Sequence, residues 1–134
     1  MDAVDIMYQK RVEKDLYHVV DLDPYGSAVP FLDSAMQAIS HGGLMCITFT
    51  DMAVLCTSNY NVQYYKYGAT VQTHKKHCHE YALRMIMHML NTRYQKHVQP
   101  LLCLTVDFYV RLFVRVYDTK SACHGAITKS SYVF

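Results

Sequence analysis

The segment Asp21-Leu22-Asp23-Pro24-Tyr25-Gly26 contains the residues whose types and spacing best fit a chemical role. A carboxylate and a neighbouring backbone carbonyl can accept both hydrogen bonds of a planar NH2 group, and an adjacent aromatic ring can stack on a base. This arrangement suits the recognition of an exocyclic amine. An Asp-Pro pair also opens many ordinary turns, so the motif by itself leaves a purely structural turn as the alternative.

A second polar pair, Thr50-Asp51, follows the next apolar run along the chain. If both runs are parallel strands, their carboxyl ends meet at one edge of the sheet, where open α/β sheets bind their ligands. We therefore expect Asp23 and Tyr25 to face the same cavity as Thr50 and Asp51. A structural cap is the alternative role for the second pair.

Two further clusters contain groups that bind metals or nucleic acids. His74, His77, Cys78 and His79 are possible metal ligands, but they lack a second well-spaced pair, so the sequence predicts no metal site there. The alternating stripe at 111–117, with Arg111 and Arg115 among its aromatic residues, resembles a face on which RNA bases stack. A neighbouring element could cover this stripe instead, and both alternatives remain open.

The elements that position the first two motifs form a βαβ pattern. Residues 17–24 are a short apolar run that ends in acids and a proline, typical of a buried parallel strand. Pro30 suits the first turn of a helix, which Gly42-Gly43 is expected to end, and residues 44–49 predict the second strand. The predicted apolar face of this helix consists of Phe31, Leu32, Ala35, Met36 and Ile39.

The second half of the chain predicts a loop, a helix and two strands. Residues 52–76 show no clear period and predict a long loop with a helical turn near 52–55. A helix is expected at about 79–96, ended by Pro100, with strands at 101–106 and 110–117 that turn near Asp107. The predicted core face of this helix is Ala82, Met85, Ile86, Met89 and Leu90, and that of the last strand is Val110, Leu112, Val114 and Val116.

Composition restricts the class of protein. The 134 residues are 51% hydrophobic and 18% charged, which is typical of one globular domain. No apolar run is long enough to span a bilayer, so no membrane contact is expected. The five cysteines follow no disulfide framework, which favours reduced thiols and a nuclear, mitochondrial or cytoplasmic location. A net charge of +2 is too small to indicate nucleic-acid binding.

Several segments in one order resemble the tRNA guanine-26 N2-dimethyltransferase family over residues 2–117. The matching segments are 21–26, 31–35, 50–55, Tyr67-Gly68, 78–84, 100–102, 106–111 and 113–116. The resemblance implies an α/β fold: the C-terminal part of a Rossmann-like class I methyltransferase domain, with parallel strands and a final antiparallel pair. It implies methyl transfer from S-adenosylmethionine to guanine N2 at tRNA position 26, first mono- and then dimethylation. It also implies tRNA as the partner and no metal in the reaction.

The resemblance assigns roles to individual residues. Asp23, Pro24 and Tyr25 correspond to the catalytic turn, in which the aspartate and the proline carbonyl face the amine and the aromatic ring holds the guanine. Tyr25, Gly26, Thr50 and Asp51 are expected to contact the substrate. Asp2 and Ala3 match the stretch that contacts the adenine of the cofactor, and Asp21 is expected on the cofactor side as a support of the turn.

Departures from the family pattern define the expected extent of this chain. Glycines occur only at 26, 42, 43, 68 and 125, so no glycine-rich turn is available to bind a nucleotide. We expect residues 1–117 to be a partial methyltransferase domain that opens with a lead-in to a strand and lacks the first βα units. Residues 118–134 are expected to be a polar tail before a further domain. The chain alone is then expected not to bind S-adenosylmethionine tightly.

Two other functions are alternatives to tRNA methylation. A non-catalytic, truncated product of the same family would at most bind RNA or a partner. Amino-methylation of adenine uses a related acid-Pro-Pro-aromatic turn, but Gly26 and the downstream segments argue against it. The sequence does not predict the oligomeric state.

Overall fold

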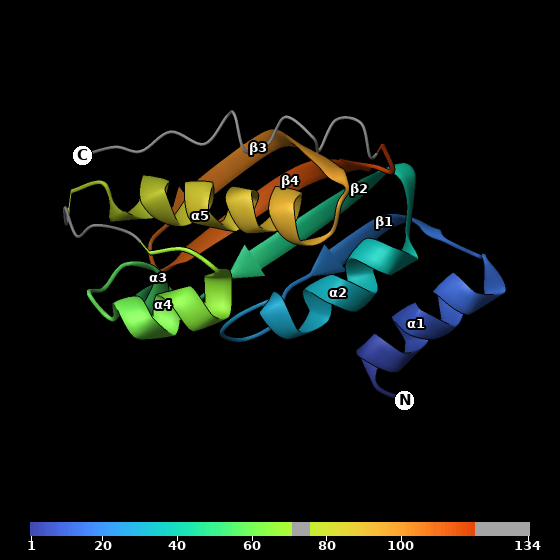
Figure 1. Ribbon diagram of the computed structural model, residues 1–134, viewed down its shortest axis with the longest axis horizontal. Helices are drawn as coiled ribbons and strands as arrows, with labels where there is room; N and C mark the ends of the chain where they lie inside the picture. The colour runs from blue at the N-terminus through green and yellow to red at the C-terminus, as the bar shows by residue number, and fades with distance from the viewer. Residues whose placement is uncertain (71–75, 120–134) are drawn as a thin grey trace.

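A computed structural model describes residues 1–70 and 76–119 and contains a four-stranded mixed sheet (Figure 1). The strand order is β1-β2-β4-β3. Strands β1 and β2 are parallel, whereas β4 is antiparallel to both β2 and β3, which confirms the predicted α/β class and the final antiparallel pair. The elements are α1 (Ala3–Glu13), β1 (Tyr17–Leu22), α2 (Val29–Ala38), β2 (Ile39–Phe49), α3 (Met52–Leu55), α4 (Tyr60–Tyr67), α5 (Cys78–Arg93), β3 (His97–Val106) and β4 (Tyr109–Tyr117).

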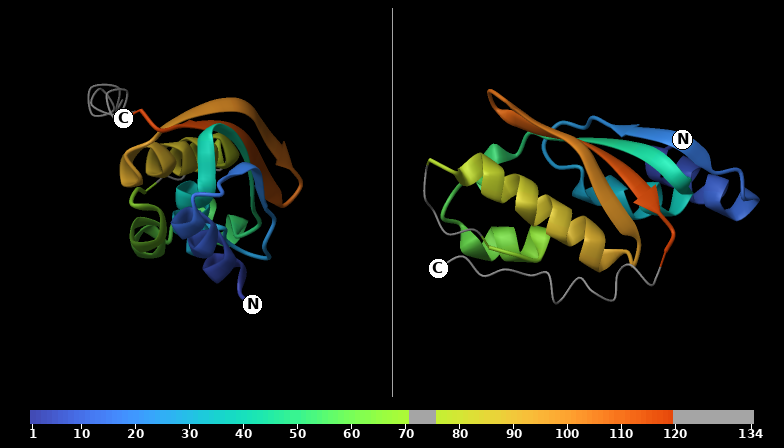
Figure 2. Two further views of the ribbon diagram at one scale, coloured as in Figure 1. Left: turned by 90° about the vertical axis from the view of Figure 1, so that its right-hand side faces the viewer. Right: turned by 90° about the horizontal axis from the view of Figure 1, so that it is seen from above.

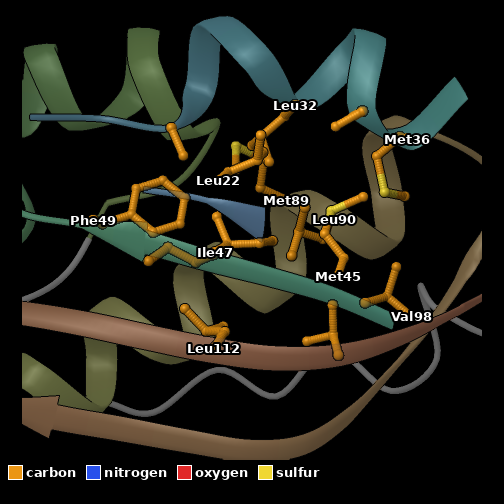
Figure 3. Close-up of a cluster of buried hydrophobic side chains, with 14 of the residues drawn as sticks. Leu22, Leu32, Met36, Met45, Ile47, Phe49, Met89, Leu90, Val98 and Leu112 are labelled. Carbon is orange, nitrogen blue, oxygen red and sulfur yellow. The ribbon is translucent and has the colours of Figure 1, made fainter. Parts of the chain in front are cut away.

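The described helices lie on one side of the curved sheet (Figure 2). The period of α5 is as predicted, and its five expected core residues are the ones it buries. Strand β4 also alternates as predicted, with its four valine and leucine residues buried. Figure 3 shows the core where α2 and α5 meet the sheet, including Leu32, Met36, Met45, Ile47, Phe49, Met89, Leu90 and Leu112.

The unit β1-α2-β2 has the predicted parallel form, but the role expected for its glycines was wrong. Helix α2 ends at Ala38, and Ile39 already has extended backbone at the start of β2. Gly42 and Gly43 lie inside this strand. A Cβ at Gly43 would stand 2.6 Å from a side-chain carbon of Ile39 and 3.1 Å from the carbonyl oxygen of His18 in β1. The Ser40 carbonyl oxygen, 2.9 Å away, is closer still than that of His18, so a Cβ is excluded mainly by the local course of β2, and not because a helix ends.

Two helices replace segments that were expected to be irregular. The chain opens with α1 instead of a lead-in to a strand, and α4 lies within the expected loop. Both helices bury little apolar surface: among their residues only Met7 of α1 and Gln63 and Tyr67 of α4 are buried. The apolar period that reveals a helix in a sequence is therefore weak in both.

Pro100 does not end α5, which stops at Arg93. It lies inside β3, a strand that begins four positions earlier than expected. Because β3 is an edge strand in the described sheet, with a register shift between Pro100 and Leu102, a residue without an N–H is tolerated there. Strand β1 forms the opposite edge, and its Val19 is 57% exposed. No described helix has the length and apolarity needed to cross a membrane.

Candidate functional site

The acid-Pro-Tyr-Gly turn and the Thr50-Asp51 pair lie at the same edge of the sheet. Strand β1 ends at Leu22 and its parallel neighbour β2 ends at Phe49, with Leu22 paired to Ile47. The segments that follow leave the sheet side by side. The shared edge is confirmed, whereas the shared cavity stays a prediction, because the side chain of Tyr25 is fully exposed.

Thr50 holds the turn through its backbone. The Gly26 N–H donates to Thr50 Oγ1 over 2.6 Å, and the Thr50 N–H donates to the Gly26 carbonyl oxygen over 2.8 Å. Gly26 has a φ of +81°, a left-handed conformation that glycine adopts without strain. These bonds fix the C-terminal end of the turn against the end of β2, so Thr50 shapes the site through Gly26.

Asp51 anchors a network of buried and half-buried polar groups. Its Oδ2 accepts hydrogen bonds from Tyr67 Oη at 2.6 Å and from Lys66 Nζ at 2.8 Å. The Tyr67 oxygen also lies 3.0 Å from Ser27 Oγ, which therefore donates to it. Burial, followed by the bond to Asp51, raises the pKa of Tyr67 well above its ordinary value. The network connects the residue after Gly26 to α4, and sequence reasoning missed Ser27, Lys66 and Tyr67 as its members.

The second oxygen of the Asp51 carboxylate has a different environment. Oδ1 is buried and has no hydrogen-bond partner among the residues that the structure describes. The alternative role of a cap is not seen for Asp51, since its side chain makes no capping bond to α3. Asp51 thus keeps one acceptor free beside the turn.

Asp21 is engaged across the sheet. Both of its carboxylate oxygens accept from Nη2 of Arg111 in β4, at 3.0 and 2.8 Å, while Nη1 of the same guanidinium donates to Thr48 in β2. The bond to Asp21 raises the pKa of Arg111. Asp21 therefore supports the strand that leads into the turn, and Arg111 of the expected RNA-stacking stripe is already paired.

Asp23 and Tyr25 differ from these engaged neighbours. Both side chains are exposed, and Tyr25 is fully so. Within residues 1–70 and 76–119, neither side chain makes a hydrogen bond or an ion pair. A carboxylate and an aromatic ring thus stand free on a backbone that Thr50 holds in place.

The residues expected on the cofactor side lie at the start of α1. One oxygen of Asp2 accepts from the Val4 N–H and caps this helix. Ala3 lines a largely apolar pocket of about 220 Å³ between α1 and β1. The other lining residues are Ile6, Met7, Tyr17, Val19 and Val20.

The structure also brings three possible metal ligands together. One ligand atom each of Cys56, Cys78 and His79 lies within 4.8 Å of the others. Burial, with a hydrogen bond to Cys78, raises the pKa of Cys56 to about 12. Of the four possible ligands noted in the sequence, Cys78 and His79 belong to this group, and His74 lies outside the described residues. Sequence reasoning predicted no metal site here and missed Cys56. The four described cysteines are free thiols.

Comparison with known proteins identifies the family of this chain. The profile of the family described as N2,N2-dimethylguanosine tRNA methyltransferase matches residues 1–134. The chain belongs to this family. It is similar to the tRNA (guanine(26)-N(2))-dimethyltransferases of Mus musculus, at 45% identity over 136 residues, and of Homo sapiens, at 46% over 136 residues. Each alignment covers 99% of this chain and 20% of the relative.

A solved member of the family agrees with the fold. The structure of Trm1 from Pyrococcus horikoshii in complex with S-adenosyl-L-methionine matches with a TM-score of 0.84 and 28% sequence identity. The match covers 96% of this chain and 34% of that one. The Rossmann-like methyltransferase class predicted from the sequence is thereby confirmed. The chain spans about a fifth of the length of the two mammalian relatives.

Proposed function

We propose that this chain provides the amine-facing turn of an enzyme that transfers methyl groups from S-adenosylmethionine to N2 of guanine 26 in tRNA, twice in succession. The observation that carries the proposal is the contrast at the sheet edge. Asp23 and Tyr25 are free, while Gly26 is held by Thr50 and the adjoining Ser27 by Tyr67. A rigid backbone with unengaged recognition groups is what a positioned substrate requires.

The turn can orient a planar amine. The Asp23 carboxylate accepts one N–H of the guanine amine, the Pro24 carbonyl accepts the other, and the Tyr25 ring stacks on the base. The lone pair of this amine is delocalised into the ring, so orientation contributes more than base strength does. The Asp23 carboxylate can also accept the proton that N2 loses when it gains a methyl group.

The described residues offer one part of a cofactor site. Asp2 has a carboxylate oxygen beyond the one that caps α1, and Ala3 opens onto the apolar pocket, which suits the edge and face of an adenine ring. When bound, S-adenosylmethionine supplies an electrophilic methyl group on a positively charged sulfur. We assign Asp2 and Ala3 to the adenine, and Asp21 to support of the turn through Arg111.

The partner that we propose is tRNA. The target base must leave its stack to reach a turn at the sheet edge, and the exposed ring of Tyr25 offers it a new stacking surface. tRNA modification places the protein inside the cell. A matched relative from Saccharomyces cerevisiae is named as mitochondrial, which makes the mitochondrion one candidate compartment.

Substitution of Asp23 in the full-length protein tests the assignment. Asp23→Ala should lower the rate of methyl transfer to a guanine-26 tRNA about 100-fold or more, because a positioned group that orients the nucleophile is lost. Binding of the tRNA should change little. Asp5→Ala, which removes an exposed carboxylate from the first turn of α1, is the matched control and should retain the wild-type rate. Near-normal turnover by Asp23→Ala would show that the catalytic assignment is wrong.

A further inference from the structure

A second group of reactive side chains lies where α3 ends and α5 begins. Cys56 caps the C-terminus of α3, and Cys78 and His79 are the first two residues of α5. The two sulfur atoms and a ring nitrogen lie within 4.8 Å of one another. All three side chains are partly exposed, so an ion can reach them from solvent.

We propose that Cys56, Cys78 and His79 bind a zinc ion. Two thiolates and an imidazole are the donor set that Zn²⁺ prefers. With Zn–S bonds of about 2.3 Å and Zn–N bonds of about 2.0 Å in tetrahedral geometry, neighbouring ligand atoms stand about 3.5–3.8 Å apart. The three atoms therefore need to close by only about 1 Å, which small side-chain rotations supply. The fourth position of the ion is left for water or another donor.

The backbone around Cys56 is fixed by a buried side chain. Gln63 of α4 is fully buried, and its Nε2 donates to the carbonyl oxygens of Val54 and Thr57, each over 2.8 Å. These carbonyls flank Cys56 on both sides. The Cys56 N–H itself donates to Met52. A ligand held on such a backbone loses little conformational freedom when it binds an ion.

The two ligands from α5 have a favourable electrostatic position. They lie in the first turn of a helix of 16 residues, and the N-terminal end of a helix attracts negative charge. The acid that follows His79 in the sequence, Glu80, pairs with Arg84 one turn further along the helix. The donors come from two helices that meet only in the folded chain, which is why ligand spacing in the sequence predicted no site.

Titration of the reduced 134-residue chain with Co²⁺, followed by displacement with Zn²⁺, tests the proposal. We expect the near-ultraviolet absorption of thiolate-to-cobalt charge transfer, abolished by Zn²⁺. Cys56→Ser, Cys78→Ser and His79→Gln should each weaken zinc binding about 100-fold or more, since loss even of an outer-shell partner costs 10- to 100-fold. Cys103→Ser, which removes a partly buried thiol from β3, is the matched control and should bind as the wild type does.

A measurement on the unaltered chain guards against variants that fail to fold. Iodoacetamide labelling, located by mass spectrometry, should show that Zn²⁺ slows the alkylation of Cys56 and Cys78 about 10-fold or more and leaves Cys103 unchanged. Equal labelling of Cys56 and Cys78 with and without Zn²⁺ would overturn the proposal. Zinc binding that survives in folded Cys56→Ser and Cys78→Ser variants would do the same, because the ion would then lie on other ligands.

Discussion

Tyr67→Phe tests whether the network behind the turn stabilises the fold. The substitution removes one oxygen and keeps the ring, which packs edge-on against Phe49 with centroids 6.1 Å apart. Any effect therefore belongs to the lost hydroxyl and not to lost packing. Asp51 would keep Lys66 as its partner, whereas Ser27 would lose the acceptor for its proton.

The expected cost follows from the bonds that the hydroxyl makes. A hydrogen bond to a charged group contributes about 1.5–3 kcal/mol, and Tyr67 donates one to the Asp51 carboxylate over 2.6 Å. We expect the free energy of unfolding to fall by about 2 kcal/mol. For a chain of this size that corresponds to a decrease in Tm of roughly 8 °C.

Urea unfolding of the 134-residue chain, followed by circular dichroism, measures this difference. Tyr65→Phe is the matched control, because Tyr65 belongs to the same helix and is 88% exposed. Its unfolding free energy should change by less than about 0.5 kcal/mol. If the two variants were equally stable, the Tyr67 hydroxyl would contribute nothing, and the network could not be what holds Ser27 and α4 at the site.

Three further outcomes are expected. Thr50→Val should lower the free energy of unfolding by about 1 kcal/mol, because the Gly26 N–H loses its partner. Thr105→Val, at an exposed position of β3, is the control and should leave the free energy of unfolding unchanged in the same urea titration. The pKa of Tyr67 is raised in the folded chain, so the unfolded chain loses this proton at lower pH and the free energy of unfolding should fall above about pH 10. The fall should be less steep in Tyr67→Phe, and urea titrations at about pH 9 and about pH 11 would measure it. Isothermal titration of the 134-residue chain with S-adenosylmethionine should detect no micromolar binding, since the chain has no glycine-rich turn for the cofactor; micromolar binding by a folded monomer would refute this.

The parts of the fold that the sequence predicted are those in which burial imposes a period. Helix α5 buries one stripe of side chains and β4 buries every second residue, so both patterns can be read from residue types alone. The site's location was predictable for a related reason. Polar residues that end two parallel strands must meet at one edge, which places Asp23 near Thr50 without any knowledge of side-chain contacts.

The parts that were missed depend on contacts between distant segments. Helix α4 has no apolar stripe, and only its caps, Asn59 and Gly68, marked it in the sequence. Gly43 fits a helix end and a strand interior equally well, and the contacts that a Cβ there would make with Ile39, Ser40 and His18 appear only in the folded chain. Cys56 joins Cys78 only through packing of α3 on α5, which no motif of adjacent residues records.

The three acids at the sheet edge differ in whether the side chain already has partners within the protein. Asp21 is paired with Arg111, and Asp51 accepts from Lys66 and Tyr67. Asp21 would have to give up its bonds to Arg111 before it could accept N–H groups from a ligand, at a cost of about 1.5–3 kcal/mol for each. Asp51 keeps one oxygen without a partner among the described residues, but that oxygen is buried, unlike the exposed carboxylate of Asp23. Asp23 has no such bond among the described residues, so in the proposed function the guanine amine would bind it without displacing a protein donor. Asp21 and Asp51 therefore support the turn, and Asp23 is the exposed carboxylate that remains available for the contact with substrate that we propose.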